Sequence, residues 1–462
     1  MKTKYLRMAT QPILALLMLV LAGGATASAQ VVTNSADNGP GTLRSAITNA
    51  ASGAVITFDP SLSGAIITLS NTLTINTNLT IDASGLPGGL QINGNYAVQI
   101  LNVASNITVI LNSLTFTNGG YSTNNGGGIY NNGTLTLTNC ILSGNSAPEG
   151  DGYGGLGGGI YNEGTLMLNQ CTLSGNHAPN GLGGGIFNLG TLTLNQCTLS
   201  GNNAYSIHGS SGGGGIFNDG ALTLNQCTLS GNSVTGDGGS IFNGGALTLN
   251  QCTLSENSAT VGSGGIENDG TLGMTNTIVG GNSGGDIFNY TGNLTYGGSN
   301  LVQSVDNYEG TITGPAPLTN APDLAPLGNY GGPTQTMPPL PDSPAIGAGS
   351  VAANTSSTDQ RGYPRTQNGL IDLGAVELQP PAANPPVLEN ITVPAGGGNG
   401  LQFTFTNAPA ADFTVLTATN VSLASTNWTV LGEVQQVAPG QYQFTDPQAA
   451  TNKARFYRVR SP

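Results

Sequence analysis

The stretch GGGIFNLGTLTLNQCTLSGNNA, residues 183–204, decides the fold because near-copies of it recur along the chain. Each copy opens on a run of glycines followed by Ile, and these Ile residues are 21 to 31 positions apart. Repeats of this length are typical of solenoid proteins, in which each repeat forms one structural unit. The other copies, of which the last is a short remnant, begin at Gly126, Gly157, Gly213, Gly238, Gly262 and Gly284.

The residue pattern inside one repeat is that of β-strands. In the first copy Leu135 and Leu137 alternate with threonines, which is a period of two. The alternation breaks at Asn139 and at the glycine clusters, so each repeat is predicted to contain about three short strands. Because such a unit cannot bury its own apolar side, stacked copies must share one core. We therefore predict an all-β chain, a right-handed parallel β-helix with one rung per repeat.

The composition excludes several other classes of protein. Only 7% of the 462 residues are charged, whereas a coiled coil requires many Glu, Lys and Arg. The 72 glycines occur in clusters, not at every third position as in collagen. Ten Lys and Arg against 23 Asp and Glu argue against a nucleic-acid partner. No Lys or Arg occurs between Arg44 and Arg361.

The N-terminus has the features of a signal peptide. A basic start is followed by the apolar run ILALLMLVLA at 13–22, and Ala27-Ser28-Ala29 fits a cleavage site. The apolar run is short for a bilayer span, and no later stretch is predicted to cross a membrane. We therefore expect a secreted or cell-surface protein that is exported through a cleavable signal peptide.

Two asparagine positions recur in every full repeat, and one cysteine position recurs in the first five. Asparagine tolerates tight turns and can hydrogen-bond the same residue of the next rung, so we expect structural ladders. The five cysteines form a column whose parallel Cβ vectors suit a buried thiol stack better than disulfides, although oxidised neighbours remain an alternative. The predicted ladders comprise Asn131, Asn162, Asn188, Asn218 and Asn243, a second asparagine column from Asn145 to Asn282, and Cys140, Cys171, Cys197, Cys227 and Cys252.

An aromatic residue follows the Ile of nearly every repeat. Such a column forms a sugar-binding strip if it faces solvent and contributes to packing if it is covered, and we expect packing. Glu267 interrupts it. The candidate binding residues are Tyr130, Tyr161, Phe187, Phe217, Phe242 and Phe288.

The acidic residues and the two histidines form no recognisable catalytic constellation. Glu149/Asp151 and Glu267/Asp269 are close in sequence, but we interpret them as solvated turn residues. A calcium site near Asp151 or Asp237 matches no calcium-loop pattern, and both histidines, His177 and His208, are expected in surface loops. We therefore predict no catalytic residue, no metal site and no cofactor.

The flanking segments divide the chain further. Residues 42–51 are the best helix candidate and are predicted to cap the first rung, whose edge would otherwise favour aggregation. The Pro-rich segment after position 378 reads as a linker before alternating strands around Trp428, the expected core residue of a last module. The expected divisions are a signal peptide at 1–29, the capped β-helix at 30–300, an irregular cap region at 301–378, a linker at 379–396 and a small β-sandwich at 397–462.

Several of these motifs resemble those of known proteins. GGGI(Y/F)N followed by LSGN resembles the GGA(I/L) and FxxN repeats of polymorphic outer-membrane proteins, with Leu in place of Phe. Residues 32–58 resemble the N-terminal segment of exported bacterial β-helix proteins. Residues 323–377, with SPAIGAG and DQRGYPRTQNGLIDLGAVE, resemble the region called choice-of-anchor Q. The resemblance implies a pectin-lyase-like β-helix on an exported or cell-surface protein, and it implies no activity.

Two functional classes follow from these observations. The first is a non-catalytic structural or adhesin-like protein, expected as a monomer, with extracellular glycans or cell-envelope components as partners. The alternative is a polysaccharide lyase or glycoside hydrolase on a pectin-lyase-like fold. The lyases that it resembles use a Lys or Arg base, and the gap in basic residues leaves the predicted β-helix without one. We therefore expect the non-catalytic class.

Overall fold

The structure is a computed structural model. It describes residues 29–120, 125–148, 155–205, 212–379, 388–392, 400–406, 413–420, 428–438, 441–447, 449 and 455–460. Apart from Ala29, the predicted signal peptide lies outside the described residues.

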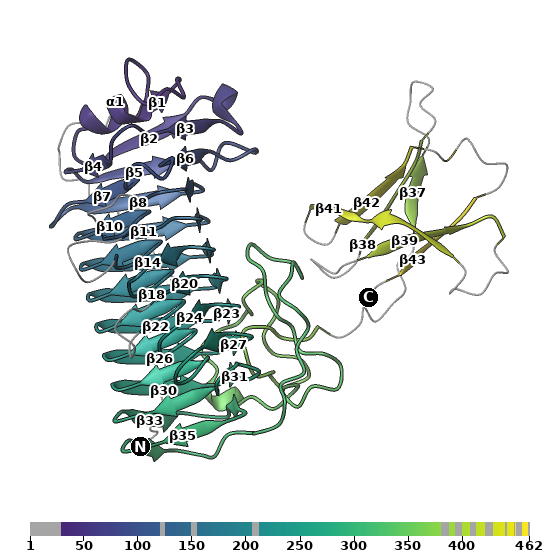
Figure 1. Cartoon of the computed structure of the whole chain (residues 1–462). Coiled ribbons are helices and arrows are strands. Elements are labelled where there is room, and N and C mark those ends of the chain that lie inside the picture. Colours follow the sequence, from purple (N-terminus) through teal and green to yellow (C-terminus); the bar gives the residue numbers. More distant parts are fainter. Residues whose placement is uncertain are drawn as a thin grey trace, which may run out of the picture.

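The repeats stack into a parallel β-helix, as Figure 1 shows. Each full repeat supplies one strand to each of three parallel sheets, so strands that are neighbours in space belong to successive repeats. The first sheet comprises β1 (Gln30–Val32), β2 (Ala54–Phe58), β5 (Leu79–Asp82), β8 (Thr108–Asn112), β11 (Thr134–Thr138), β14 (Thr165–Asn169), β18 (Thr191–Asn195), β22 (Ala221–Asn225), β26 (Ala246–Asn250), β30 (Thr271–Thr275), β33 (Asn293–Tyr296) and β36 (Thr311–Thr313).

The other two long sheets have ten strands each. The second comprises β4 (Leu73–Ile75), β7 (Leu101–Val103), β10 (Ile129–Asn131), β13 (Ile160–Asn162), β17 (Ile186–Asn188), β21 (Ile216–Asn218), β25 (Ile241–Asn243), β29 (Ile266–Asn268), β32 (Ile287–Asn289) and β35 (Val305–Asn307). The third comprises β3 (Ile66–Thr68), β6 (Gln91–Asn93), β9 (Thr115–Thr117), β12 (Ile141–Ser143), β15 (Thr172–Ser174), β19 (Thr198–Ser200), β23 (Thr228–Ser230), β27 (Thr253–Ser255), β31 (Ile278–Val279) and β34 (Leu301–Val302). A short fourth sheet comprises β16 (His177–Ala178), β20 (Asn203–Ala204), β24 (Ser233–Val234) and β28 (Ser258–Ala259).

The pairing register places equivalent positions of successive repeats beside one another. Strands β17 and β21 pair in parallel, so that Ile186 lies opposite Ile216 and Phe187 opposite Phe217. The Ile side chains are fully buried, as are the repeated leucines, and together they form one continuous core. The all-β fold class and the parallel β-helix are therefore confirmed.

The break in alternation marks a corner of each rung. Asn139 adopts a backbone φ of 53°, and Gln196 at the same repeat position adopts 54°. Few residues other than glycine accept this left-handed conformation, and asparagine is the commonest exception. The chain therefore turns here from the first sheet into the third, directly before each cysteine.

The two asparagine columns run through the interior of the β-helix. In the column from Asn131 to Asn289, each side-chain amide donates to the carbonyl oxygen of the next asparagine, at 2.6–2.8 Å up to Asn307. In the column that starts at Asn145, the same contact measures 2.9 Å at every step to Asn282. Because these amides have no access to water, the ladders provide hydrogen-bond partners for polar groups that would otherwise be buried without one.

The cysteine column is also internal, and all five thiols are buried and free. Each thiol donates to a backbone carbonyl oxygen, as Cys197 does to Leu168. We expect a disulfide-forming thiol reagent to titrate no thiol in the native protein and five after unfolding in guanidinium chloride, because reaction requires access. A count of three in the unfolded protein would reveal an oxidised pair and contradict the free column.

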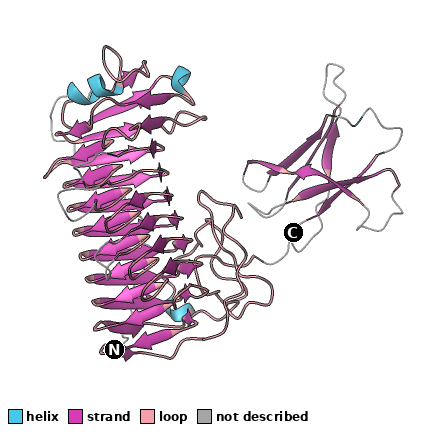
Figure 2. Cartoon of the chain, in the orientation of Figure 1, coloured by secondary structure: helices cyan, strands magenta, loops and turns pink. Residues whose placement is uncertain are grey.

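A short helix covers the first rung. Helix α1 (Leu43–Thr48) begins at the N-cap Thr42, whose side-chain oxygen accepts from the Ser45 N–H at 3.2 Å. Its apolar face, with Leu43 and Ile47, packs onto the end of the core. Figure 2 shows the helix at one side of the first strands and the 3₁₀ turn η1 (Pro60–Leu62) at the other. Among the described residues, no helix has the length and apolar character needed to cross a bilayer.

Residues after β36 return along the outside of the β-helix instead of closing its last rung. Gln360 donates to the carbonyl oxygen of Cys197 at 3.1 Å and accepts from Thr228 at 2.6 Å. Further along, the N–H of Gly374 donates to the Asn276 carbonyl oxygen at 2.8 Å. This return segment, residues 323–377, contains a single short 3₁₀ turn, η2 (Val351–Ala353), and covers the third sheet over several rungs (Figure 1).

The C-terminal module has two antiparallel sheets around one small core. This confirms the small β-sandwich that was predicted after the β-helix. Phe403, Val415 and Tyr442, which come from both sheets, are buried together. Trp428 is half-buried. One sheet comprises β37 (Glu389–Thr392), β38 (Leu401–Thr406), β42 (Gln441–Asp446) and β41 (Gln435–Ala438), and the other comprises β40 (Thr429–Glu433), β39 (Thr414–Ala418) and β43 (Phe456–Arg460).

Candidate functional site: an acidic and aromatic cleft

The aromatic column runs along the outer face of the second sheet. Ring centroids of successive residues are 4.7–5.3 Å apart, and the planes are within 15° of parallel. From Tyr161 to Phe242 the rings are only 6–7% exposed. Because these rings are almost completely buried, this part of the column offers no ring surface to a sugar. The continuous stack comprises Tyr130, Tyr161, Phe187, Phe217 and Phe242.

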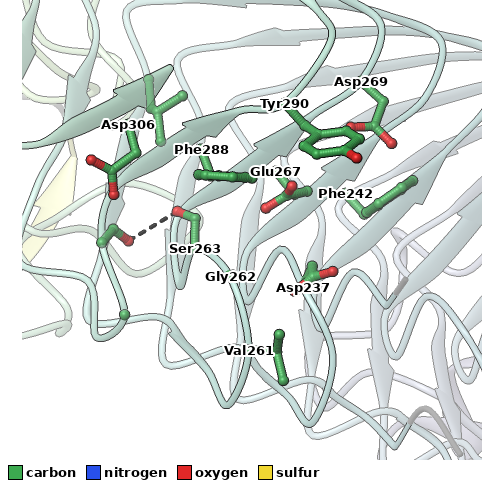
Figure 3. A pocket seen from close by; sticks show the side chains of 13 residues that line it. Asp237, Phe242, Val261, Gly262, Ser263, Glu267, Asp269, Phe288, Tyr290 and Asp306 are labelled. Carbon is green, nitrogen blue, oxygen red and sulfur yellow. Dashed lines mark hydrogen bonds between the residues drawn. The ribbon is translucent and has the colours of Figure 1, made fainter. Parts of the chain in front are cut away.

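The column is broken at one rung. In the strand register Phe242 of β25 lies opposite Glu267 of β29, which lies opposite Phe288 of β32. A carboxyl side chain therefore occupies the place of a ring, and Figure 3 shows it between Phe242 and Phe288. The missing ring leaves space on the outer face of the sheet.

A cavity of about 660 Å³ lies at this break. Its wall combines aromatic rings with carboxyl groups, a composition suited to ligands that are partly apolar and partly polar. Gly262 also lines the cavity, and any Cβ there would lie 2.5 Å from Asp237 Oδ1 and 2.9 Å from Glu267 Oε2. The lining side chains used in the argument below are Asp237, Phe242, Glu267, Asp269, Phe288 and Tyr290 (Figure 3).

Glu267 is the most unusual group in the cleft. It is only 5% exposed, and its Oε2 has no hydrogen-bond partner among the described residues. Burial, together with the charges of Asp237 and Asp269, raises the pKa of Glu267 to about 8, against a smaller opposing effect from the Ser263 backbone N–H. The carboxyl group is therefore largely protonated at neutral pH in the empty cleft.

Asp237 reaches the cleft from the preceding rung. Burial raises its pKa to about 6, and the charge of Asp269 contributes in the same direction. The pKa of Asp269 is also raised, by burial first and by Asp219 second. The cleft thus holds carboxyl groups that destabilise one another's charged forms.

Two exposed tyrosines extend the aromatic surface beyond the break. Tyr290 lies 6.1 Å from Phe288 between ring centroids, and Tyr308 lies 5.3 Å from Tyr290 at an interplanar angle of 5°. Unlike the covered rings of the column, Tyr290 and Tyr308 are 44% and 64% exposed. An open aromatic strip therefore begins where the covered column ends.

These positions differ in part from the sequence interpretation. The prediction that Glu267 is a solvated turn residue is wrong, because it lies within β29 and faces a pocket, whereas Asp269 is exposed. Asp237 was not linked to Glu267, since they are 30 residues apart. A signal for this cleft was present in the repeat alignment, where Glu267 occupies the position of an aromatic ring and Asp237 directly precedes the glycines of its repeat.

The other predicted positions give no second site of this kind. The asparagine and cysteine columns are internal and present no surface. The prediction that His177 lies in a surface loop is wrong, because it is half-buried within the strand β16. Glu149, Asp151 and His208 lie outside the described residues. In the described part of the chain, no group of three or more His, Cys, Asp or Glu side chains is arranged to hold a metal ion. A smaller polar cavity of about 400 Å³ lies between the third-sheet corner at Gln226 and Thr358 of the return segment.

The raised pKa values predict a decrease of stability with rising pH. Between about pH 4.5 and 8, folded Glu267 retains a proton that the unfolded chain has lost, so the free energy of unfolding falls as pH rises. We expect the melting temperature to fall from pH 5 to pH 8 and to fall less in Glu267→Gln, which cannot ionise. Glu163→Gln, at an exposed carboxylate of an earlier rung, is the control and should follow the wild type. Parallel curves for Glu267→Gln and the wild type would contradict the assignment.

Comparisons of the chain with protein families, with curated proteins and with solved structures find no match.

Proposed function

We propose that this chain is an exported, non-catalytic β-helix protein that binds an extracellular polysaccharide in the cleft around Glu267. The observation that carries the proposal is the change from a covered to an open aromatic column at this rung. Phe288, Tyr290 and Tyr308 offer ring surfaces at the part of the described column where Glu267 replaces a ring. Sugars present flat apolar faces and hydroxyl groups, which match rings and carboxyl oxygens.

The architecture supports a surface role. Each rung repeats one set of side chains, so the β-helix acts as a rigid rod that holds the cleft at a fixed place. The apolar N-terminal run and its small-residue cleavage site support export. A long stretch without Lys or Arg also gives trypsin-like proteases no cleavage point, which suits an extracellular protein.

A glycoside hydrolase is the second candidate, and one observation favours it. Glu267 and Asp237 flank the same glycine, and their pKa values of about 8 and about 6 differ. Near neutral pH such a pair holds one protonated and one ionised carboxyl group, the combination that hydrolysis of a glycosidic bond requires. Binding is the first proposal because the exposed rings of Tyr290 and Tyr308 offer a contact surface that hydrolysis by the carboxyl pair alone does not require.

The test is retention of the protein on immobilised polysaccharides that are neutral, anionic or cationic. We expect retention on at least one of them, and a loss of about tenfold or more in affinity for the double variant Phe288→Ala/Tyr290→Ala. Tyr96→Ala is the control, since Tyr96 is an open ring on an earlier rung, 65% exposed. Retention on none, or no effect of the double variant, would contradict the proposal. Release of reducing or unsaturated sugar ends, abolished by Glu267→Gln, would favour the enzyme instead.

A further inference from the structure

The cleft carries a negative charge that no basic side chain of the β-helix can neutralise. Asp237, Glu267 and Asp269 line it, and Asp306 lies at its edge. The nearest Lys and Arg in the sequence are Arg44 and Arg361, which lie before and after the whole series of repeats. A surface of this kind repels anions and attracts cations.

Glu267 provides a second and independent indication of a ligand. Acidic residues on a surface are usually hydrated, but Glu267 is 95% buried and its Oε2 accepts no hydrogen bond from any described residue. An unpaired buried carboxyl oxygen is unfavourable, and natural proteins rarely retain one without a reason. A bound donor would satisfy it.

We propose that this cleft binds a protonated amino group carried on a sugar ring. The inference rests on the proposed function and specifies it: the polysaccharide is one rich in unacetylated amino sugars.

The aromatic rings favour an organic ammonium group as the cation. Phe242 and Phe288 lie on either side of the Glu267 carboxyl group, so a cation at that carboxyl group would also lie beside aromatic rings (Figure 3). Attraction between an ammonium group and an aromatic ring adds to the ion pair when the site excludes water. An ammonium group also carries several N–H donors, enough for Glu267 and Asp237 together.

The open tyrosine strip favours a sugar over a peptide as the carrier of that amino group. Tyr290 and Tyr308 are stacked and exposed, and they continue the line of rings beyond Phe288. The next sugar of a chain can lie against these rings while its neighbour places the amino group at Glu267. A lysine side chain of a partner protein would leave Tyr290 and Tyr308 without a contact.

Binding of a cation must change the protonation of the cleft. The groups that act on Glu267 are Asp237 from the preceding rung and Asp269 from the following turn, with Asp219 acting on Asp269. Since each of them raises a neighbouring pKa, a cation lowers those pKa values and drives protons off. Proton release on binding is therefore a signature that a merely structural role of Glu267 would not produce.

The experiment is isothermal titration calorimetry of the full chain at pH 7 with three sugar hexamers. They are a β-1,4-linked glucosamine hexamer, its N-acetylated counterpart and a galacturonate hexamer. We expect the glucosamine hexamer to bind about tenfold or more tightly than the N-acetylated one, to weaken with added salt and to release protons, as shown by enthalpies that differ between buffers. The conservative variants Glu267→Gln and Asp237→Asn should each remove most of this preference, whereas Glu163→Gln should retain it.

The other outcomes separate this inference from the function on which it rests. Equal affinity for the two glucosamine-based hexamers, or tighter binding of galacturonate, would overturn the amino-sugar assignment and leave polysaccharide binding intact. Tighter binding of a lysine hexapeptide than of the glucosamine hexamer would overturn the inference that a sugar carries the amino group. If millimolar calcium ions displaced the glucosamine hexamer at constant ionic strength, the cleft would be a metal site, and the inference that it binds an organic ammonium group would be overturned. Binding of no hexamer by the wild type would overturn both the inference and the proposed function.

Discussion

Replacing Asn202 by alanine is expected to destabilise the β-helix by about 3–5 kcal/mol, one of the largest effects of any single substitution in this chain. The side-chain carbonyl oxygen of Asn202 accepts from the backbone N–H and the side-chain amide of Asn176, at 3.1 and 2.9 Å. Its own amide donates to Leu173 and to Asn232, at 3.0 and 2.9 Å. Alanine makes none of these contacts, and no water reaches the side chain, which is fully buried.

Asn195 in the same repeat provides the matched control. It belongs to an outer asparagine row, where it donates to Asn169 at 2.8 Å, but it is half-buried and water can replace its partners. Asn195→Ala should therefore cost about 1 kcal/mol or less. Equilibrium unfolding in guanidinium chloride, followed by circular dichroism, measures both variants. Equal losses for Asn202→Ala and Asn195→Ala would show that the inner ladder contributes no more than the outer row.

Replacing Asp359 by alanine is expected to release the return segment, with a loss of about 3–5 kcal/mol. The Asp359 carboxylate is fully buried and accepts from the Arg361 guanidinium at 2.8 and 3.0 Å and from the backbone N–H groups of Arg361, Tyr363 and Glu377 at 2.9–3.1 Å. Its backbone carbonyl oxygen also accepts from Gln196 of the β-helix at 2.9 Å. The substitution leaves the Arg361 guanidinium without its ion-pair partner and three backbone N–H groups without their acceptor.

Hydrogen exchange reports this release directly, because the β-helix can remain folded while the segment detaches. Protection of amides such as Gly374, which donates to Asn276, should fall by about a hundredfold or more in Asp359→Ala. Asp342→Ala, at an exposed carboxylate of the same segment, should leave exchange unchanged. Unchanged protection in Asp359→Ala would mean that contacts other than this carboxylate hold the segment.

The architecture of the β-helix could be predicted from the sequence because each repeat has the same residue types at the same positions. The Ile and Leu positions specify the buried face, Asn139 specifies the corner, and the glycine clusters specify turns. A one-residue slip would place every leucine on the outer face, so the register of successive repeats was also determined. The first helix could be located from the sequence, although it spans Leu43–Thr48 and not the whole of 42–51.

The return segment could not be placed from the sequence. Its contacts join Gln360 to Cys197 and Thr228, more than 130 residues away in the chain, and no periodic pattern records such pairs. Its polar residues satisfy β-helix backbone and side-chain groups one by one, so the contacts depend on geometry that only the folded chain has. The sequence indicated an irregular region after the repeats but not the face of the β-helix that it covers.

The cleft could be predicted from the sequence only in part. The break of the aromatic column at Glu267 was visible in the repeat alignment, but its meaning depended on the exposure of the neighbouring rings. Tyr290 and Tyr308 occupy turn positions outside the repeated motif, so their stacking beside Phe288 was not predictable. The burial of Glu267 likewise depends on how closely the adjacent rungs pack around it.

A crystal structure of the chain with the glucosamine hexamer tests the central claim most directly. We predict that one amino nitrogen lies within hydrogen-bonding distance of the Glu267 carboxyl group and that a neighbouring sugar ring lies against Tyr290. A hexamer bound elsewhere, for example in the polar cavity between Gln226 and Thr358, with the cleft around Glu267 empty, would contradict the claim.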